Sequence, residues 1–249
     1  MVIPIADDNS RRRTTPGITY LLIAVNVLVF LAMVRTTPTE QARLMATYAA
    51  VPRAVLHDGP TAWLTLLTSM FMHAGWLHLG GNMLFLWIFG DNVEDAMGHL
   101  RYLGFYLLCG VVAGLTQVAV DPSGTTPLVG ASGAIAGVLA AYVVLFPRGM
   151  VRTILVVVRP PLFVWPLLPA WLLIGGWFFL QFWSGLSSLG ALAAGGVAYW
   201  AHVGGFMLGA VLAKPFARAG GVEHRLATTR RYPQDLYRRD PYGRQPPRW

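Results

Sequence analysis

Charge, cysteine and lysine are all scarce in this sequence. Only 12% of its 249 residues are charged while 55% are hydrophobic, and the mean hydropathy is +0.52. This composition excludes an ordinary soluble domain. The single cysteine, Cys109, excludes an intramolecular disulfide and a cysteine-based metal cluster. We interpret the chain as a polytopic membrane protein with one membrane domain.

Long apolar runs are what the chain does have, and each is close to the ~20 residues that an α-helix needs to cross a bilayer. They predict an all-α protein with six transmembrane helices, over Ile18–Val34, Leu77–Ala96, Tyr102–Val120, Leu128–Phe146, Leu167–Trp183 and Gly195–Ala213. The first run follows an arginine-rich segment, as a signal peptide does. It is long enough to span, however, and no small-residue cleavage site follows it, so we expect a retained helix.

The distribution of basic residues indicates the orientation of these helices. Sixteen of the 19 Lys and Arg residues lie outside the six runs on one side, which includes both ends of the chain. Because cytoplasmic loops are enriched in Lys and Arg, both termini are expected in the cytoplasm. This predicts a basic cytoplasmic segment (1–17), a membrane domain (18–213) and a basic, disordered cytoplasmic tail (214–249) that attracts anionic lipid. The long first loop, 35–76, is expected in or on the outer interface.

Three polar signatures interrupt the apolar runs: His78 with Asn82, Ser132 within Gly-Ala-Ser-Gly, and His202 within Ala-His-Val-Gly-Gly. Polar side chains at bilayer depth are costly, so we interpret them as functional. In the topology above, all three signatures fall in the outer layer. His78 and Asn82 are four residues apart, so they project from one helix face.

Close approach of Ser132 and His202 requires two helices that nearly touch. Each of these helices carries a glycine pair at the small-xxx-small spacing that lets backbones pack tightly: Gly133 with Gly137, and Gly205 with Gly209.

A serine hydroxyl needs a base to act as a nucleophile. The only lysine, Lys214, lies at the cytoplasmic end of the last run, and the carboxylates of the second run, residues 91, 94 and 95, lie at its inner end. Histidine is the remaining base, so the sequence predicts a dyad of Ser132 and His202.

At these residues the chain resembles the rhomboid family of intramembrane serine proteases. The resemblance covers most of 67–213 and rests on four ordered motifs: Leu67 to His78 followed by Asn82, Gly90-Asp91-Asn92-Val93-Glu94 with Gly98, Gly130-Ala131-Ser132-Gly133-Ala134, and Ala201-His202-Val203-Gly204-Gly205. It implies a six-helix bundle and a serine endopeptidase without a cofactor or metal.

The resemblance also implies roles. Ser132 would attack the scissile carbonyl, and His202 would accept its proton and return it to the leaving amine. His78, Asn82 and the Ser132 backbone N–H would stabilise the oxyanion. The substrates implied are single-span membrane proteins cut near the outer face. The fifth helix is implied to be a side gate, although its aromatic residues are equally interpreted as lipid-facing anchors.

The chain departs from the family pattern at two places. The Trp-Arg pair that is frequent in the first loop is replaced by Leu64-Thr65, with Trp63 displaced by one position. Some family members place an aromatic residue four positions after the serine to support the histidine ring, and here that residue is Ala136.

Several alternatives remain open. His73, His78 and His202 could bind a metal, although no His-Glu-x-x-His motif is present. A catalytically inactive relative would bind membrane clients without cleaving them, and a channel or transporter would show internal repeats. No nucleic-acid partner is expected. The scarcity of lysine beside abundant arginine and alanine favours a bacterial plasma membrane as the location.

Overall fold

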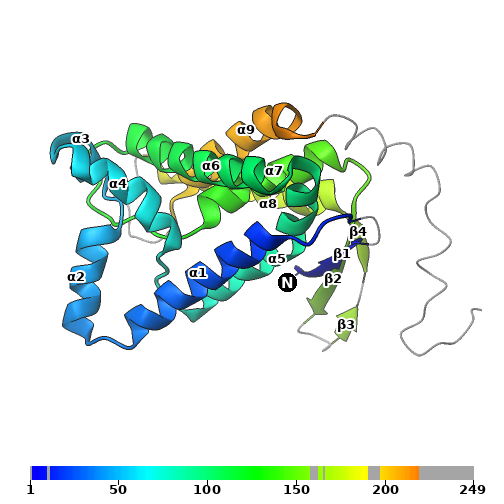
Figure 1. Ribbon diagram of the computed structural model, residues 1–249, viewed down its shortest axis with the longest axis horizontal. Helices are drawn as coiled ribbons and strands as arrows, with labels where there is room; N and C mark the ends of the chain where they lie inside the picture. Colours follow the sequence, from blue (N-terminus) through cyan, green and yellow to red (C-terminus); the bar gives the residue numbers. More distant parts are fainter. Residues whose placement is uncertain (1, 10–11, 158–161, 165, 190–196, 219–249) are drawn as a thin grey trace, which may run out of the picture.

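The computed structural model describes residues 2–9, 12–157, 162–164, 166–189 and 197–218. The described residues are mostly helical, and six helices lie where the apolar runs are: α1 (Gly17–Val34), α5 (Trp76–Met97), α6 (His99–Val120), α7 (Ser132–Leu145), α8 (Ala170–Ser188) and α9 (Tyr199–Phe216). Figure 1 shows α1 beside α5, with α6 to α9 packed above them. Helix α7 is central because it contacts α5, α6, α8 and α9.

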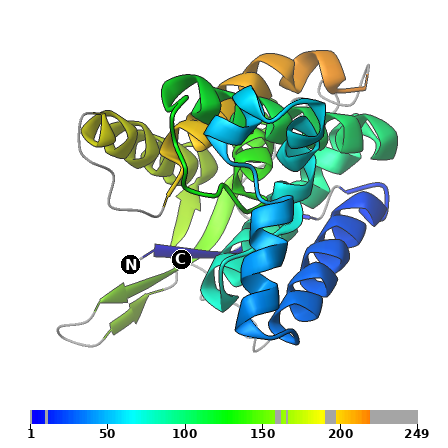
Figure 2. The ribbon, with the colours of Figure 1, turned by 90° about the vertical axis from the view of Figure 1, so that its left-hand side faces the viewer.

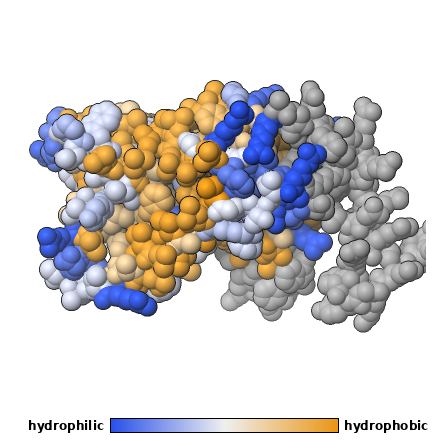
Figure 3. All heavy atoms as spheres, viewed as in Figure 1, coloured by the Kyte–Doolittle hydropathy of each residue, from blue (hydrophilic) through white to orange (hydrophobic). Residues whose placement is uncertain are grey.

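Apolar and hydrophilic side chains occupy different parts of the molecular surface. By length and composition, α1 and α6 are apolar enough to cross a membrane, and α7 is a shorter apolar helix. Apolar side chains cover the middle of the face in Figure 3, while hydrophilic side chains gather toward its two ends. An apolar belt between hydrophilic ends is the surface that a bilayer requires.

The first loop is largely helical. It contains α2 (Pro38–Tyr48), α3 (Pro52–His57), α4 (Pro60–Thr68) and the short 3-10 helix η1 (Ser69–Phe71). Each of its three α-helices begins with proline, whose fixed φ suits the first helical position. Leu66 of α4 packs against Gly114 of α6. These elements form one end of the molecule, at the left of Figure 1.

A small sheet lies at the opposite end, so the expectation of an all-α fold is wrong there. Strand β1 (Val2–Asp7) pairs antiparallel with β2 (Met150–Val157), which also pairs with β3 (Leu162–Val164) and β4 (Leu167–Pro169). Figure 2 shows these strands at the lower left, to one side of the helices. Pairing between residues so distant in sequence leaves no local periodic signal.

The C-terminal end of α5 holds the start of α1. Glu94, which is fully buried, accepts hydrogen bonds from the backbone N–H of Ile18 at 2.9 Å and of Thr19 at 2.7 Å. The Thr19 hydroxyl also donates to Glu94, at 2.8 Å. These are N–H groups that a helix cannot satisfy internally, and a carboxylate complements the helix dipole at that end. Glu94 therefore attaches α1 to α5.

Several predicted boundaries change, including the end of the fifth run, which lies at Ser188 rather than Trp183. The fourth run begins its helix at Ser132 rather than Leu128, because Leu128 pairs with Ala50 of the first loop in a β-bridge. Strand β4 occupies the first residues of the fifth run, and α8 begins after Pro169. The start predicted for the sixth run, 195–196, lies outside the described residues, and α9 continues to Phe216, beyond the predicted boundary at 214. Most of the predicted tail, 219–249, also lies outside them.

Candidate active site

Ser132 is the first residue of α7, directly after a tight turn. Gly130 has φ +117°, in the region that favours glycine, and its N–H donates to the carbonyl of Ser69 at 2.9 Å. The turn presents Ser132 at a helix N-terminus, where backbone N–H groups lack intrahelical partners and the helix dipole favours negative charge. A negative oxygen that forms next to Ser132 would be stabilised there.

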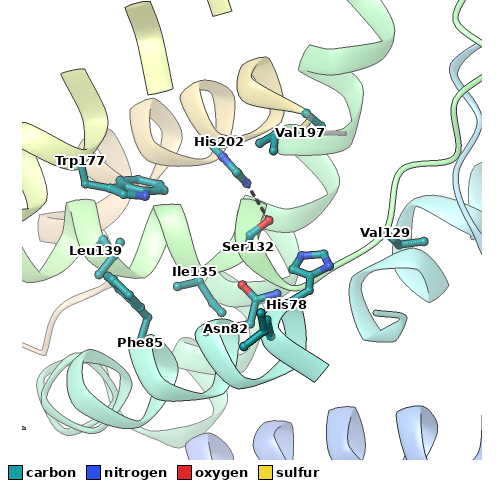
Figure 4. A pocket seen from close by; sticks show the side chains of 13 residues that line it. His78, Asn82, Phe85, Val129, Ser132, Ile135, Leu139, Trp177, Val197 and His202 are labelled. Atoms are coloured by element: carbon teal, nitrogen blue, oxygen red, sulfur yellow. Dashed lines mark hydrogen bonds between the residues drawn. The ribbon is translucent and has the colours of Figure 1, made fainter. Parts of the chain in front are cut away.

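His202 meets Ser132 from the neighbouring helix α9. Its Nε2 lies 2.7 Å from the Ser132 Oγ (Figure 4). A Cβ built on Gly205 would lie 2.9 Å from the carbonyl carbon of Gly133, so only glycine allows α7 and α9 this separation. The close helix approach predicted from the glycine pairs is therefore confirmed, and it brings Ser132 and His202 into hydrogen-bonding contact.

The other ring nitrogen of His202 contacts Gln181 of α8. Its Nδ1 lies 2.7 Å from the Gln181 Oε1, and the Trp177 ring lies 5.6 Å from the imidazole, centroid to centroid. Gln181 and Trp177 are therefore the residues of α8 that contact the His202 imidazole. Sequence reasoning missed Gln181, and the available signal was a polar amide within the apolar run of α8.

His78 and Asn82 converge on the turn before Ser132. A Cβ built on Gly130 would lie 2.7 Å from the His78 Nε2 and 3.5 Å from the Asn82 Nδ2. The two residues come from the same face of α5, as their spacing predicts, and Figure 4 shows both beside Ser132. Both nitrogens therefore point to one small space that the absence of a side chain at Gly130 keeps open.

His73 holds the Asn82 amide, a contact that the sequence did not suggest. Its Nε2 lies 2.9 Å from the Asn82 Nδ2, and its side chain is only 1% exposed. Burial, together with the adjacent His78, lowers the pKa of His73 to about 4. The imidazole is thus neutral at pH 7 and its Nε2 can accept one amide N–H, which leaves the second N–H of Asn82 for the pocket.

All four predicted site residues line one pocket of about 350 Å³. The pocket opens between α5, α7, α8 and α9, and its walls are mainly apolar: Leu77, His78, Gly81, Asn82, Phe85, Val129, Ser132, Ile135, Leu139, Trp177, Val197, Ala198 and His202. His78 and His202 are the titratable groups among these described lining residues. The apolar walls favour an apolar guest.

Lys214 lies far from this pocket. Lys214 is twelve residues after His202 on α9, which is about 18 Å along a helix, and the backbone N–H of Arg218 beyond it donates to the Ala96 carbonyl at the C-terminal end of α5. Within the part of the chain that the structure describes, no group of three or more His, Cys, Asp or Glu side chains is arranged to hold a metal ion. His73 and His78 instead stack edge to face, 5.0 Å apart.

The aromatic residues of α8 divide between two environments. Phe178 stacks on Phe206 of α9 at 4.1 Å between centroids, and Trp177 lies beside His202. Phe179 and Trp183 are each 60% exposed. One face of α8 thus packs on α9 and the opposite face is directed outward, so the lipid-anchor interpretation fits only part of the set.

Comparison with known proteins identifies the same region. Residues 60–219 match the Rhomboid domain family, which is more than half of the chain. The chain is 35% identical to Rhomboid protease GluP of Bacillus subtilis over 142 residues, which are 56% of this chain and 27% of that protein. It is 32% identical to the human mitochondrial Presenilin-associated rhomboid-like protein over 147 residues, 57% of this chain and 35% of that protein.

A plant relative matches a shorter stretch. Rhomboid-like protein 11, chloroplastic, of Arabidopsis thaliana is 42% identical over 87 residues, 35% of this chain and 30% of that protein. The matched region spans about a quarter to a third of the length of these relatives. The likeness therefore concerns the helical domain that contains the pocket.

Proposed function

Because this chain belongs to the rhomboid family of integral membrane proteins, we propose that it is an intramembrane serine endopeptidase. Its substrates are single-span membrane proteins, and it cuts them near the outer face of the bilayer. The observation that carries the proposal is the 2.7 Å contact between the Ser132 Oγ and the His202 Nε2 inside an apolar pocket. Hydroxyl and imidazole at this distance are what nucleophilic acyl transfer needs.

The reaction follows from these positions. Ser132 donates its hydroxyl proton to the His202 Nε2 while its Oγ attacks the scissile carbonyl carbon. The imidazolium then donates that proton to the leaving amine, and an acyl-enzyme remains on Ser132. In the second half of the reaction, water gives a proton to His202 and hydrolyses the ester. His202 then returns the proton to the Ser132 oxygen, which restores the hydroxyl.

Several hydrogen-bond donors are placed to stabilise the negative charge that develops on the substrate carbonyl oxygen. The backbone N–H of Ser132 belongs to the first turn of α7, and the His78 Nε2 and Asn82 Nδ2 converge beside Gly130. Donors arranged in advance at such a position stabilise the transition state more than the ground state, each by about 3 kcal/mol. The neutral His73 keeps the Asn82 amide directed into the pocket.

The membrane arrangement is part of the proposal. We place α1, α5, α6, α7, α8 and α9 as six spans with both termini in the cytoplasm, supported by the basic residues near the chain ends and the apolar belt in Figure 3. The pocket then faces the outer side, because it lies toward the α2–α4 end of the molecule. We propose the bacterial plasma membrane as the location and anionic lipid as the partner of the basic tail.

A panel of tagged reporters with different transmembrane segments tests the proposal. Full-length protein is co-expressed with each reporter, and cleavage products are detected by the tags. Wild type is expected to cut at least one reporter, while Ser132→Ala and His202→Ala cut none. The control is Ser187→Ala, because the Ser187 hydroxyl, exposed on α8, bonds only to its own helix at Trp183.

A fluorescent alkyl fluorophosphonate gives a second measurement that needs no substrate. It phosphonylates an activated serine, so it should label wild type and the Ser187→Ala control but not the Ser132→Ala variant. Reporter cleavage by folded Ser132→Ala would overturn the mechanism. If wild type binds reporters but neither cleaves them nor is labelled by the fluorophosphonate, the protein is instead an inactive client-binding relative.

A further inference from the structure

The hydrogen bond between His202 and Gln181 connects the dyad to a third helix. The Gln181 Oε1 lies 2.7 Å from the His202 Nδ1, and the opposite ring nitrogen, Nε2, lies 2.7 Å from the Ser132 Oγ. His202 is only 9% exposed. The imidazole is thus held at both ends, by an amide oxygen from α8 and a hydroxyl from α7.

The chemistry of the amide oxygen selects one tautomer of His202. A carbonyl oxygen can only accept a hydrogen bond, so Nδ1 must carry the hydrogen and donate it. In a neutral imidazole Nε2 is then unprotonated and accepts from the Ser132 hydroxyl. The opposite tautomer would place a hydrogen between Nε2 and Oγ, and His202 could not remove the serine proton.

The hydrogen bond to Gln181 is the contact that the described residues make with the His202 Nδ1. His78 on α5 is the other titratable group there, and its Nε2 is directed to Gly130. Trp177, beside the imidazole ring, carries an indole N–H that can only donate. Gln181 is therefore the acceptor that the described surroundings offer to Nδ1.

The packing of α8 on α9 keeps Gln181 in place. Phe178 stacks on Phe206, and Phe182 meets Trp200 edge to face, 6.0 Å apart. A Cβ built on Gly185 would lie 3.2 Å from the Trp200 ring. Residues 178, 181, 182 and 185 share one helix face, so the amide is directed at His202 by a packed surface.

We propose that Gln181 is a positioning residue that fixes the tautomer and orientation of His202 for catalysis. The proposal rests on the proposed serine protease activity. When Ser132 attacks, its proton moves to Nε2, the Nδ1–H bond to Gln181 remains, and the Gln181 carbonyl dipole stabilises the imidazolium that forms. The proton then leaves from Nε2 to the amine of the cleaved bond, and Gln181 itself exchanges no proton.

Three variants of the full-length protein test the role. Gln181→Met keeps a similar volume and removes the acceptor, whereas Gln181→Glu keeps an acceptor in its place. Gln117→Met on α6 is the matched control, since it makes the same replacement outside the Ser132–His202–Gln181 chain of hydrogen bonds. Each variant is compared with wild type for thermal unfolding in detergent, for the rate of fluorophosphonate labelling, and for kcat and KM on a reporter that wild type cleaves.

The expected results separate positioning from substrate binding. Gln181→Met should lower the labelling rate and kcat by about 10- to 100-fold, by analogy with loss of the partner that orients a metal-bound histidine, with KM nearly unchanged. Gln181→Glu should stay within about tenfold of wild type. The carboxylate stabilises the imidazolium, so the acid limb of its pH–rate profile should move to higher pH. Gln117→Met should behave as wild type.

A spectroscopic measurement reads the tautomer without any substrate. Nitrogen-15 shifts of selectively labelled His202 should show hydrogen on Nδ1 in wild type and a tautomer mixture in Gln181→Met. The inference is overturned if folded Gln181→Met labels and cleaves at the wild-type rate, if its tautomer does not change, or if Gln181→Glu is as slow as Gln181→Met. Absence of cleavage and labelling in wild type would refute the proposed protease, and the nitrogen shifts would still decide whether Gln181 sets the tautomer.

Discussion

Replacing Gly209 with alanine is expected to move His202 away from Ser132 although it touches neither residue. Gly209 lies on α9 and faces Gly137 of α7. A Cβ built there would lie 2.5 Å from the Gly137 Cα and 2.7 Å from its carbonyl carbon, against 3.4 Å for ordinary contact. These are backbone atoms, so no rotamer change relieves the clash. The two helices must separate by roughly 1 Å.

The consequence for catalysis can be worked from the same geometry. Gly209 is seven residues after His202, or about 10 Å along the helix. If α9 moves as a rigid body, the contact between Nε2 and Oγ lengthens from 2.7 Å toward about 3.7 Å, beyond hydrogen-bond range. A misplacement of this size costs about 100-fold in rate, and overpacking costs about 1–3 kcal/mol of stability.

Fluorophosphonate labelling and reporter cleavage measure the rate loss, and thermal unfolding in detergent measures stability. Gly104→Ala on α6 is the matched control, because a Cβ there meets nothing within 4 Å; it should keep full activity. A folded Gly209→Ala protein that labels and cleaves at the wild-type rate would refute the reasoning. It would show that the close α7–α9 packing does not set the distance between Ser132 and His202.

Three further predictions concern other parts of the molecule. Asn82→Ala should lower kcat by about 100- to 1,000-fold with little effect on KM, because an oxyanion donor is lost; an unchanged kcat in reporter assays would exclude that role. Glu94→Ala should destabilise the protein by at least about 2 kcal/mol in detergent unfolding, since buried donors lose their acceptor. Glu40→Ala, at a half-exposed side chain of α2, should have little effect; an equal loss of stability in the two variants would contradict the role of Glu94 as a helix cap. Burial and the nearby charge of Asp91 raise the pKa of Asp7 from 3.8 to about 7, so the docking of β1 should be strongest below about pH 4 and should weaken as pH rises to about 7. Amide exchange of β1 should show this weakening in wild type and not in Asp7→Asn, and the same pH dependence in both would argue against Asp7.

The helix positions were predicted from apolar runs in the sequence. They agree with the structure where the whole run is helical. An uninterrupted apolar run reads directly as a helix, so α1 and α6 begin and end within three residues of the predictions. The start of α7 was wrong because Leu128 is apolar yet extended and bonded to Ala50. Apolar composition does not distinguish a strand-like segment from a helical turn when the partner is distant in sequence.

The sheet was not predicted either, because its strands also pair with partners that are distant in sequence. β1 and β2 are separated by more than a hundred residues and pair only once the chain is folded. The Asp7 side chain joins the sheet to the helices, because its Oδ2 accepts hydrogen bonds from Tyr142 at 2.8 Å and from Asn92 at 2.7 Å. None of these three residues has a sequence neighbour that indicates the others.

The sequence by itself determined which groups could do chemistry here. Spacing placed His78 and Asn82 on one helix face, and small residues beside Ser132 and His202 allowed two backbones to meet, because helix geometry follows from local sequence. Only the tertiary structure decided how the His202 ring is held. Its Nδ1 bonds to Gln181, an amide on a third helix, and the partner of a buried polar atom depends on how helices pack rather than on any local pattern.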